Sequence, residues 1–181
     1  MLIDESATLS FNQAVTSNVD VTMPRSDEQN NSEESLRREV EDLSMTLVKI
    51  LNDPGLCTNP FMLKHMSTTF RIIRERTNEY CPLGNPMSRE EHLNNLRNLQ
   101  LQFPAYVIEP LNACALIEPS NSPKTSGPRA TVWTTVKVGG LPGAISRESV
   151  SILHWRKREP ESPWVCHRHE EVRGGGGQTD Y

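Results

Sequence analysis

The sequence predicts an α+β fold in which N-terminal helices pack on one face of a curved antiparallel sheet. Amphipathic helical patterns occupy the first half of the chain, at 33–52 and 88–103. β-branched and aromatic segments joined by short turns occupy the second half. Helices and strands segregated along the chain in this way are typical of α+β domains. The 181 residues suit a single domain.

Both ends of the chain have compositions that do not suit a core. Residues 1–32 hold few large apolar side chains and many Ser, Asn, Asp and Glu, so burial cannot offset their ordering entropy. The glycine run at 174–177 is typical of a flexible tail. We therefore expect a domain at 33–173, with a disordered tail at 1–32 and a flexible tail at 174–181.

Two helices are predicted before the first strand. Leu36, Val40, Leu43 and Leu47 recur at three- and four-residue steps with charged residues opposite, which predicts one buried helical stripe over 33–52. The turn residues Asp53-Pro54-Gly55 end this helix. A second, short helix is expected to open with Asn59 as its N-cap and Pro60 in the first helical position.

The third helix has the clearest boundaries in the chain. Ser88 and Glu91 have the spacing of a capping box, in which each side chain binds the other residue's backbone N–H. The helix must stop before Pro104, because the residue preceding a proline is disfavoured in helical geometry. Its apolar stripe consists of Leu93, Leu96, Leu99 and Phe103.

Strands are predicted wherever β-branched and aromatic residues cluster between turn residues. The segment 67–74 fits a strand, although a helix continuing through it also suits the spacing of Met66, Phe70 and Ile73. Residues 106–117 form one long strand or two pieces broken at Pro110. The remaining strands are expected at 130–138, 146–157 and 164–172.

Charge and composition argue against several classes of protein. The formal charge of −4 disfavours a nucleic-acid binder, and solvated strand edges account for the local basic cluster at 156–158. No apolar run is long enough to predict a membrane-spanning helix. The acidic start of the chain does not resemble a secretory signal, and the four scattered cysteines suit reduced thiols. These features predict a cytoplasmic protein that binds neither nucleic acid nor membrane.

A local motif in the second half resembles a known family. Ala130-Thr131-Val132-Trp133, the turn at 139–143 and Glu148-Ser149-Val150 are similar to the fungal SnoaL-like branch of the NTF2-like (cystatin-like) family. The resemblance covers about residues 33–174. It implies a sheet wrapped on helices as a cone, a pocket at the open end, and homodimerisation through the convex sheet face. The family includes fungal isomerases, cyclases and dehydratases of secondary metabolism, so fold alone does not settle function.

The last strand carries the most suggestive side chains. Strand alternation predicts that His167, His169 and Glu171 share one face, while Cys166, Arg168 and Glu170 share the other. Two histidines can bind a metal or act as acid and base near neutral pH. A metal site needs a third ligand, and the sequence identifies none, so no metal is assigned. The alternative is a polar strand face exposed to water or to a dimer partner.

Other strands and helices supply further candidates. Glu148 and His154 share one face of the preceding strand, and a carboxylate among apolar walls could move a proton. Equally, Glu148 could pair with a neighbouring residue at the surface. Trp133 fits pocket lining, dimer packing or plain core. Tyr106 and His65 are further ligand-binding candidates, whereas His92, near the start of the third helix, is expected to be solvated.

The leading hypothesis is a cytoplasmic, homodimeric protein with a pocket for a small hydrophobic ligand. If it is catalytic, we expect cofactor-free isomerisation, cyclisation or dehydration of a polyketide- or terpenoid-like substrate by acid–base proton transfer. The assigned groups are His167 or His169 as acid or base and Glu148 as partner. Trp133, His154, His65 and Tyr106 are assigned to the ligand. The alternative is a non-catalytic binding or dimerisation module, which divergent positions of these side chains would favour.

Overall fold

A computed structural model describes residues 27–74, 87–118, 127–142, 146–159 and 161–172. The predicted helix at the start begins at Asp27, earlier than expected, and the two predicted tails otherwise lie outside the described residues. The helices and strands are α1 (Asp27–Ile50), α2 (Pro60–His65), β1 (Met66–Arg74), β2 (Met87–Ser88), α3 (Arg89–Gln102), β3 (Val107–Glu118), β4 (Arg129–Gly139), β5 (Arg147–Arg156) and β6 (Val165–Val172).

The helix ends form as the sequence predicts. The backbone N–H of Phe61 donates to Asn59 Oδ1 at 2.9 Å, which caps the start of α2. At α3 the capping box is complete: the Ser88 N–H donates to Glu91 Oε2 at 2.7 Å, and the Glu91 N–H donates to Ser88 Oγ at 3.3 Å. The helix ends at Gln102, just before the Phe103–Pro104 step.

The described strands form one sheet in the order β2-β1-β6-β5-β4-β3. The segment after α2 is a strand and not a continued helix. Residues 107–118 make one strand, with a register shift between Pro110 and Asn112. The prediction of an antiparallel sheet holds for every neighbouring pair except β1 and β6, which run parallel.

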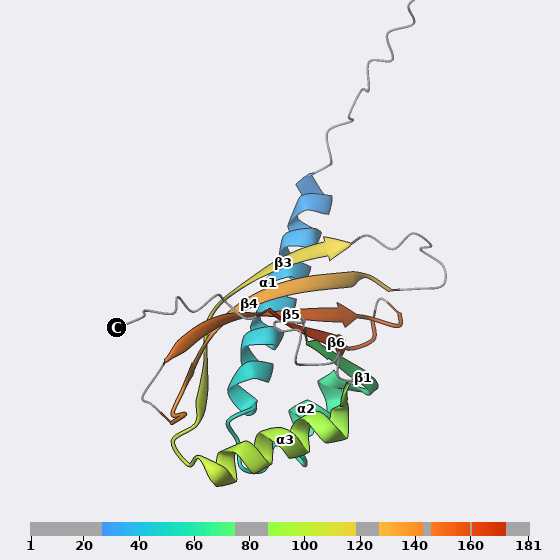
Figure 1. Cartoon of the computed structure of the whole chain (residues 1–181). Helices are drawn as coiled ribbons and strands as arrows, with labels where there is room; N and C mark the ends of the chain where they lie inside the picture. Colours follow the sequence, from blue (N-terminus) through green and yellow to red (C-terminus); the bar gives the residue numbers. More distant parts are fainter. Residues whose placement is uncertain (1–26, 75–86, 119–126, 143–145, 160, 173–181) are drawn as a thin grey trace, which may run out of the picture.

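Helix α1 crosses one face of the sheet, and α2 and α3 lie near its C-terminal end (Figure 1). We call the face beneath α1 the inner face and the opposite one the outer face. Alternation in β4 separates them: Val132 and Val136 are buried, whereas Trp133 and Lys137 are exposed. The largest fully buried side chains of this inner core are Trp155, Trp164, Phe70, Leu56, Met62, Val40 and Val132.

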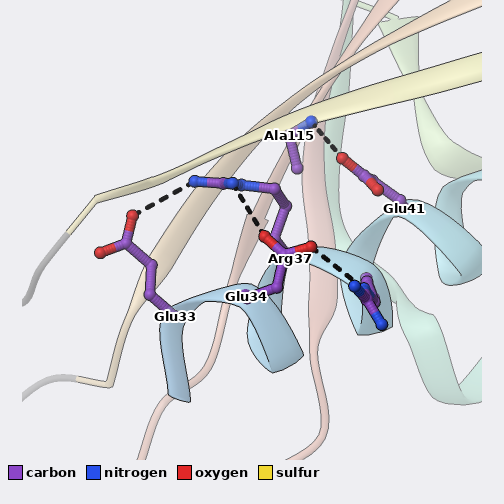
Figure 2. A network of polar contacts seen from close by, with 6 residues as sticks. Glu33, Glu34, Arg37, Glu41 and Ala115 are labelled. Carbon is purple, nitrogen blue, oxygen red and sulfur yellow. Dashed lines mark hydrogen bonds and ion pairs between the residues drawn. The ribbon is translucent and has the colours of Figure 1, made fainter. Parts of the chain in front are cut away.

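Two polar side chains, Glu41 within α1 and Asn52 just after it, bind the open edge of β3. The backbone N–H of Ala115 donates to Glu41 Oε1 at 2.8 Å (Figure 2). Asn52, just after α1, accepts from the N–H of Ile108 at 2.8 Å and donates to its carbonyl at 2.7 Å. An edge strand otherwise presents unpaired backbone groups that invite pairing with another chain. These contacts occupy two positions along the edge and fix α1 to the sheet.

Candidate functional sites on the two faces of the sheet

A β-bulge in β6 changes the predicted arrangement of the last strand. Arg168 pairs with His154 and Cys166 pairs with Trp155, which leaves His167 as the extra residue. Strand alternation is therefore broken at His167: its ring lies 6.4 Å from that of His154, whereas His169 is buried on the inner face. The prediction that His167 and His169 share a face is wrong.

The same bulge separates the residues predicted on the other face. Cys166 is fully buried on the inner face, whereas Arg168 and Glu170 meet on the outer face, with Arg168 Nη2 2.7 Å from Glu170 Oε1. A one-residue insertion reverses the facing of every side chain beyond it, because the side-chain period of a strand is two. The prediction that Cys166 shares a face with Arg168 and Glu170 is therefore wrong.

His169 meets a histidine that the sequence analysis placed in solvent. His92 of α3 is only 6% exposed, and its ring centroid lies 5.9 Å from that of His169 in an edge-on arrangement. Phe70 of β1 lies on the other side, 6.0 Å from the His92 ring. The expectation of a solvated His92 is wrong. A signal for its burial existed, because His92 lies one helical turn before the buried Leu96.

Further polar side chains lie beside this histidine pair on the inner face. Thr134, Ser151 and Glu171 are directly opposite one another across β4, β5 and β6. Thr134 is fully buried and Ser151 is 8% exposed, while Glu171 follows His169 by two residues on the same face. We call His92, Thr134, Ser151, His169 and Glu171 the inner polar cluster. Within the described part of the chain, Thr134 Oγ1 has no hydrogen-bond partner.

The inner polar cluster combines groups that can exchange protons with groups that can orient a ligand. An imidazole can accept or donate a proton near neutral pH, and a carboxylate can accept one. Hydroxyl groups such as those of Thr134 and Ser151 can donate to, or accept from, a ligand oxygen. A buried hydroxyl without a partner costs free energy, so a bound water or ligand at Thr134 would recover it.

The remaining catalytic candidates lie on the outer face. His154 Nε2 is 2.9 Å from Glu170 Oε1, and its Nδ1 is 3.3 Å from Thr131 Oγ1. Glu148 shares this face with His154, as predicted, but it is exposed and lies opposite Lys137. His167 and Glu148 are thus on the opposite side of the sheet from His169, and the three do not converge.

The ligand-binding candidates are also divided between the faces. Trp133 is 39% exposed on the outer face, in register with Cys114 of β3 and Ile152 of β5. His65 is buried at the end of α2, where its Nδ1 donates to the Trp164 carbonyl at 2.8 Å. Tyr106 precedes β3 and packs partly buried against the core. Trp133, His65 and Tyr106 therefore do not form one site with His92 and His169.

His167 has an unusual electrostatic environment. Burial, followed by the electrostatic influence of Arg156, His154, Arg129 and Arg168, together lowers its pKa to about 4. Its imidazole is therefore neutral at pH 7.

Over the described residues, no set of three or more His, Cys, Asp or Glu side chains is placed to hold a metal ion. Among the described helices, none is both long and apolar enough to cross a membrane.

Comparison with known proteins gives likeness in structure only. No protein-family model matches the chain, and no curated protein matches it. The association domain of CaMKII from C. elegans is similar over 79% of this chain and 99% of that one, with 16% identity and a TM-score of 0.51. An NTF-2-like protein of unknown function, PA1314 from Pseudomonas aeruginosa, covers 76% of this chain, with 97% of its own length matched, 15% identity and a TM-score of 0.48.

A third solved structure, a protein of unknown function with a cystatin-like fold from Nostoc punctiforme, covers 85% of this chain and 97% of its own. Its identity is 11% and its TM-score is 0.47. At these identities the likeness concerns the fold and not the activity. In this chain, helices pack on one side of a mostly antiparallel six-stranded sheet. The chain has the α+β NTF2-like (cystatin-like) fold.

Proposed function

We propose that this protein binds a small hydrophobic ligand against the inner polar cluster and moves a proton on it without a cofactor. The observation that carries the proposal is the contact between His92 and His169, whose buried rings lie 5.9 Å apart. Two imidazoles shielded from water supply one group to take a proton and one to return it.

The surroundings of the pair suit an apolar substrate with an oxygen function. Phe70 and Leu153 provide apolar contact beside the histidines. Thr134 and Ser151 offer hydroxyl groups along the same face, and Glu171 offers a carboxylate. A ketone or enol could be oriented by the hydroxyls while an imidazole acts at the neighbouring carbon. This assignment keeps His169 from the sequence analysis and replaces His167 and Glu148 with His92 and Glu171.

Deuterium exchange of 2-tetralone in D₂O, followed by NMR, tests the proposal. Proton abstraction beside a carbonyl is a step that isomerisation, cyclisation and dehydration can share, so the probe does not require the natural substrate. We expect exchange above the buffer rate, with a loss of about 10²-fold or more in His169→Gln, the range typical of a removed general base. His154→Gln, a matched change on the outer face, should exchange like the wild type.

If folded His169→Gln exchanged as fast as the wild type, the assignment of His169 as the general base would be wrong. Binding is read separately, from chemical-shift changes of His92 and His169 on adding 1-naphthol, an aromatic hydroxyl that cannot exchange by this route. Shifts without exchange would leave a binding protein in place of an enzyme. Neither shifts nor exchange would remove the ligand site as a whole.

A second candidate function, self-association through the outer face, is favoured by a separate observation. Cys114, Trp133 and Ile152 lie in register across β3, β4 and β5, and Leu116 beside them is 52% exposed. Large apolar side chains gathered on one exposed face often mark an interface. The edge of β3 is partly capped by Glu41 and Asn52, so we expect a second copy to bind the face instead of the edge. The likeness in fold to an association domain is consistent with this role.

Sedimentation equilibrium of the full chain tests self-association. We expect a dimer that Trp133→Ser weakens at least about tenfold, because a tryptophan at an interface centre is commonly a dominant contact. Leu101→Ser, a change at a 72% exposed leucine of α3, is the control and should leave the dimer intact. A wild-type monomer at all concentrations would exclude this candidate without touching the ligand proposal.

A further inference from the structure

Three arginines gather at one end of the outer face, and the strand register brings them there. Arg129 of β4 lies directly opposite Arg156 of β5. Arg168 of β6 pairs with His154, the outer-face residue that precedes Arg156 by two positions. Like charges placed directly opposite each other in a sheet destabilise the pairing. This arrangement therefore carries a cost that an anion bound between the arginines would offset.

The β-bulge adds a histidine to the same place. His167, the extra residue of β6, is close to His154, 6.4 Å between ring centroids, and the charges of Arg129, Arg156 and Arg168 all act on it. Bulges commonly re-aim a side chain next to a functional site. We call Arg129, Arg156, His167 and Arg168 the outer basic cluster.

The charges around this cluster are only partly balanced. Glu170 of β6 binds Arg168 at 2.7 Å and His154 at 2.9 Å. Glu118 of β3 lies opposite Arg129, but its Oε1 accepts from Thr131 Oγ1 at 3.4 Å. Across the residues that the structure describes, neither Arg129 nor Arg156 forms an ion pair or a side-chain hydrogen bond. Two guanidinium groups are thus left to bind something else.

The neighbouring Lys157 does not belong to the cluster. Its Nζ lies 5.3 Å from the ring centroid of Trp164 and 3.6 Å from Glu39 Oε2, both on the inner side. The basic run at 156–158 in the sequence is therefore not one continuous patch. What remains is compact and flanked by Glu118 and Glu170, which would repel an extended polyanion such as a nucleic acid.

We infer that Arg129, Arg156, His167 and Arg168 form a binding site for a small phosphate group, carried by inorganic phosphate or by a phosphomonoester metabolite. Guanidinium groups match phosphate oxygens in pairs of hydrogen bonds, and the neutral imidazole of His167 can donate one more. The site lies on the opposite face of the sheet from the inner polar cluster and does not depend on the function proposed for that cluster.

Titration with sodium phosphate at pH 6.5, followed through the imidazole NMR signals of His167, tests the site in the full chain. Sodium chloride at matched ionic strength is the comparison, because screening alone also moves a histidine that is surrounded by arginines. We expect a saturable shift with phosphate and only a gradual one with chloride. Bound phosphate should also raise the pKa of His167, since an anion favours the protonated ring.

Arg156→Gln should weaken phosphate binding at least about fivefold, because it removes one of the two unpaired guanidinium groups. Arg97→Gln, the same change at an exposed position of α3, is the matched control and should bind like wild type. The Arg156 variant should also unfold at an equal or higher urea concentration than wild type without phosphate, since the replacement relieves the repulsion from Arg129. A retained fold separates lost binding from lost structure.

Glycerol 3-phosphate distinguishes the sources of the phosphate group. Tighter binding of this ester than of inorganic phosphate supports a metabolite, and equal binding supports the free anion. A non-saturable shift, or equal affinity in the Arg156 and Arg97 variants, overturns the site. If a single-stranded oligonucleotide bound but phosphate gave no saturable shift, the phosphate site would also be overturned, and the cluster would instead bind a polyanion.

Discussion

The carboxylate of Glu41 in α1 accepts a hydrogen bond from the backbone N–H of Ala115 in β3 at 2.8 Å (Figure 2). Ala115 is buried and belongs to β3, the edge strand of the described sheet, so its N–H has no other described strand to pair with. Glu41 thus replaces a missing neighbour strand at this point. Next to it on α1, Arg37 binds both Glu33 and Glu34, so these two carboxylates do not compete with Glu41 for the N–H of Ala115.

Glu41→Ala should lower the free energy of unfolding by about 1–3 kcal/mol, because it leaves a partly buried backbone N–H without its acceptor. Glu41→Gln retains an amide oxygen and should lose less. Urea denaturation with an unchanged m-value measures both. Asp42→Ala, at the exposed neighbouring position, is the control. Equal stability of Glu41→Ala and Asp42→Ala would mean that the contact contributes nothing net.

Local signals in the sequence predicted the elements of this fold well. Ser88 and Glu91 fixed the start of α3, and Pro104 limited its end, because caps and proline act within a few residues. The strand predicted at 130–138 forms as β4. Such features follow from chain geometry alone, so one sequence is enough to read them.

The candidate sites were harder to predict because they depend on how distant strands pair. The bulge at His167 exists only in the register between β5 and β6, and no residue type in Cys166-His167-Arg168 requires it. The contact of His92 with His169 joins α3 to β6, elements far apart in the chain. The parallel pairing of β1 with β6 is likewise a property of the assembled sheet.

The low pKa of His167 makes the stability of the fold depend on pH. Its pKa is about 4 when folded and 6.5 as the ordinary value, so the unfolded chain binds more protons between these limits. The stability that the neutral His167 ring allows is fully present above pH 6.5 and is lost as pH falls towards 4. Because the ring is partly exposed, the effect should stay well below the limiting value of about 1.4 kcal/mol per pH unit.

His167→Gln removes this titration and should lose less stability than wild type between pH 6.5 and 4.5. Urea midpoints at several pH values in this range measure the difference, in which the titration of the carboxylates common to both proteins cancels. Parallel pH profiles for the two proteins would show that the His167 ring has the same pKa in the folded and unfolded states, which would contradict the lowering of its pKa by burial and neighbouring charges.

Two cysteines should differ sharply in reactivity. Burial raises the pKa of Cys166 to about 12, and its thiol donates to the Arg168 carbonyl at 3.6 Å. Cys114 is exposed on the outer face of β3. Because the thiolate is the reactive form, iodoacetamide at pH 8 should modify Cys114 roughly a hundredfold faster than Cys166. Peptide mass mapping measures this, and urea should abolish the difference. Early alkylation of Cys166 in the folded protein would contradict its burial.

Adjacent glycines at the end of β4 offer a matched pair of substitutions. Gly140 has a φ of 75°, a region that residues with a Cβ rarely adopt, and an added Cβ would lie 1.8 Å from the carbonyl oxygen of Ala105. Gly139→Ala would bring its Cβ only to 3.6 Å from Val107 Cγ1, an ordinary contact. The Cβ of Gly140→Ala would clash with backbone atoms, which cannot move away as the end of a side chain can.

Gly140→Ala should therefore lower the free energy of unfolding by at least about 2 kcal/mol, while Gly139→Ala should change it by less than about 1 kcal/mol. Urea denaturation of both variants beside wild type gives the comparison. The position also explains why the segment before β3 and the turn after β4 can approach so closely: only a residue without a Cβ fits between them. Equal losses in the two variants would show that this close approach relaxes readily, and that Gly140 is not required by its geometry.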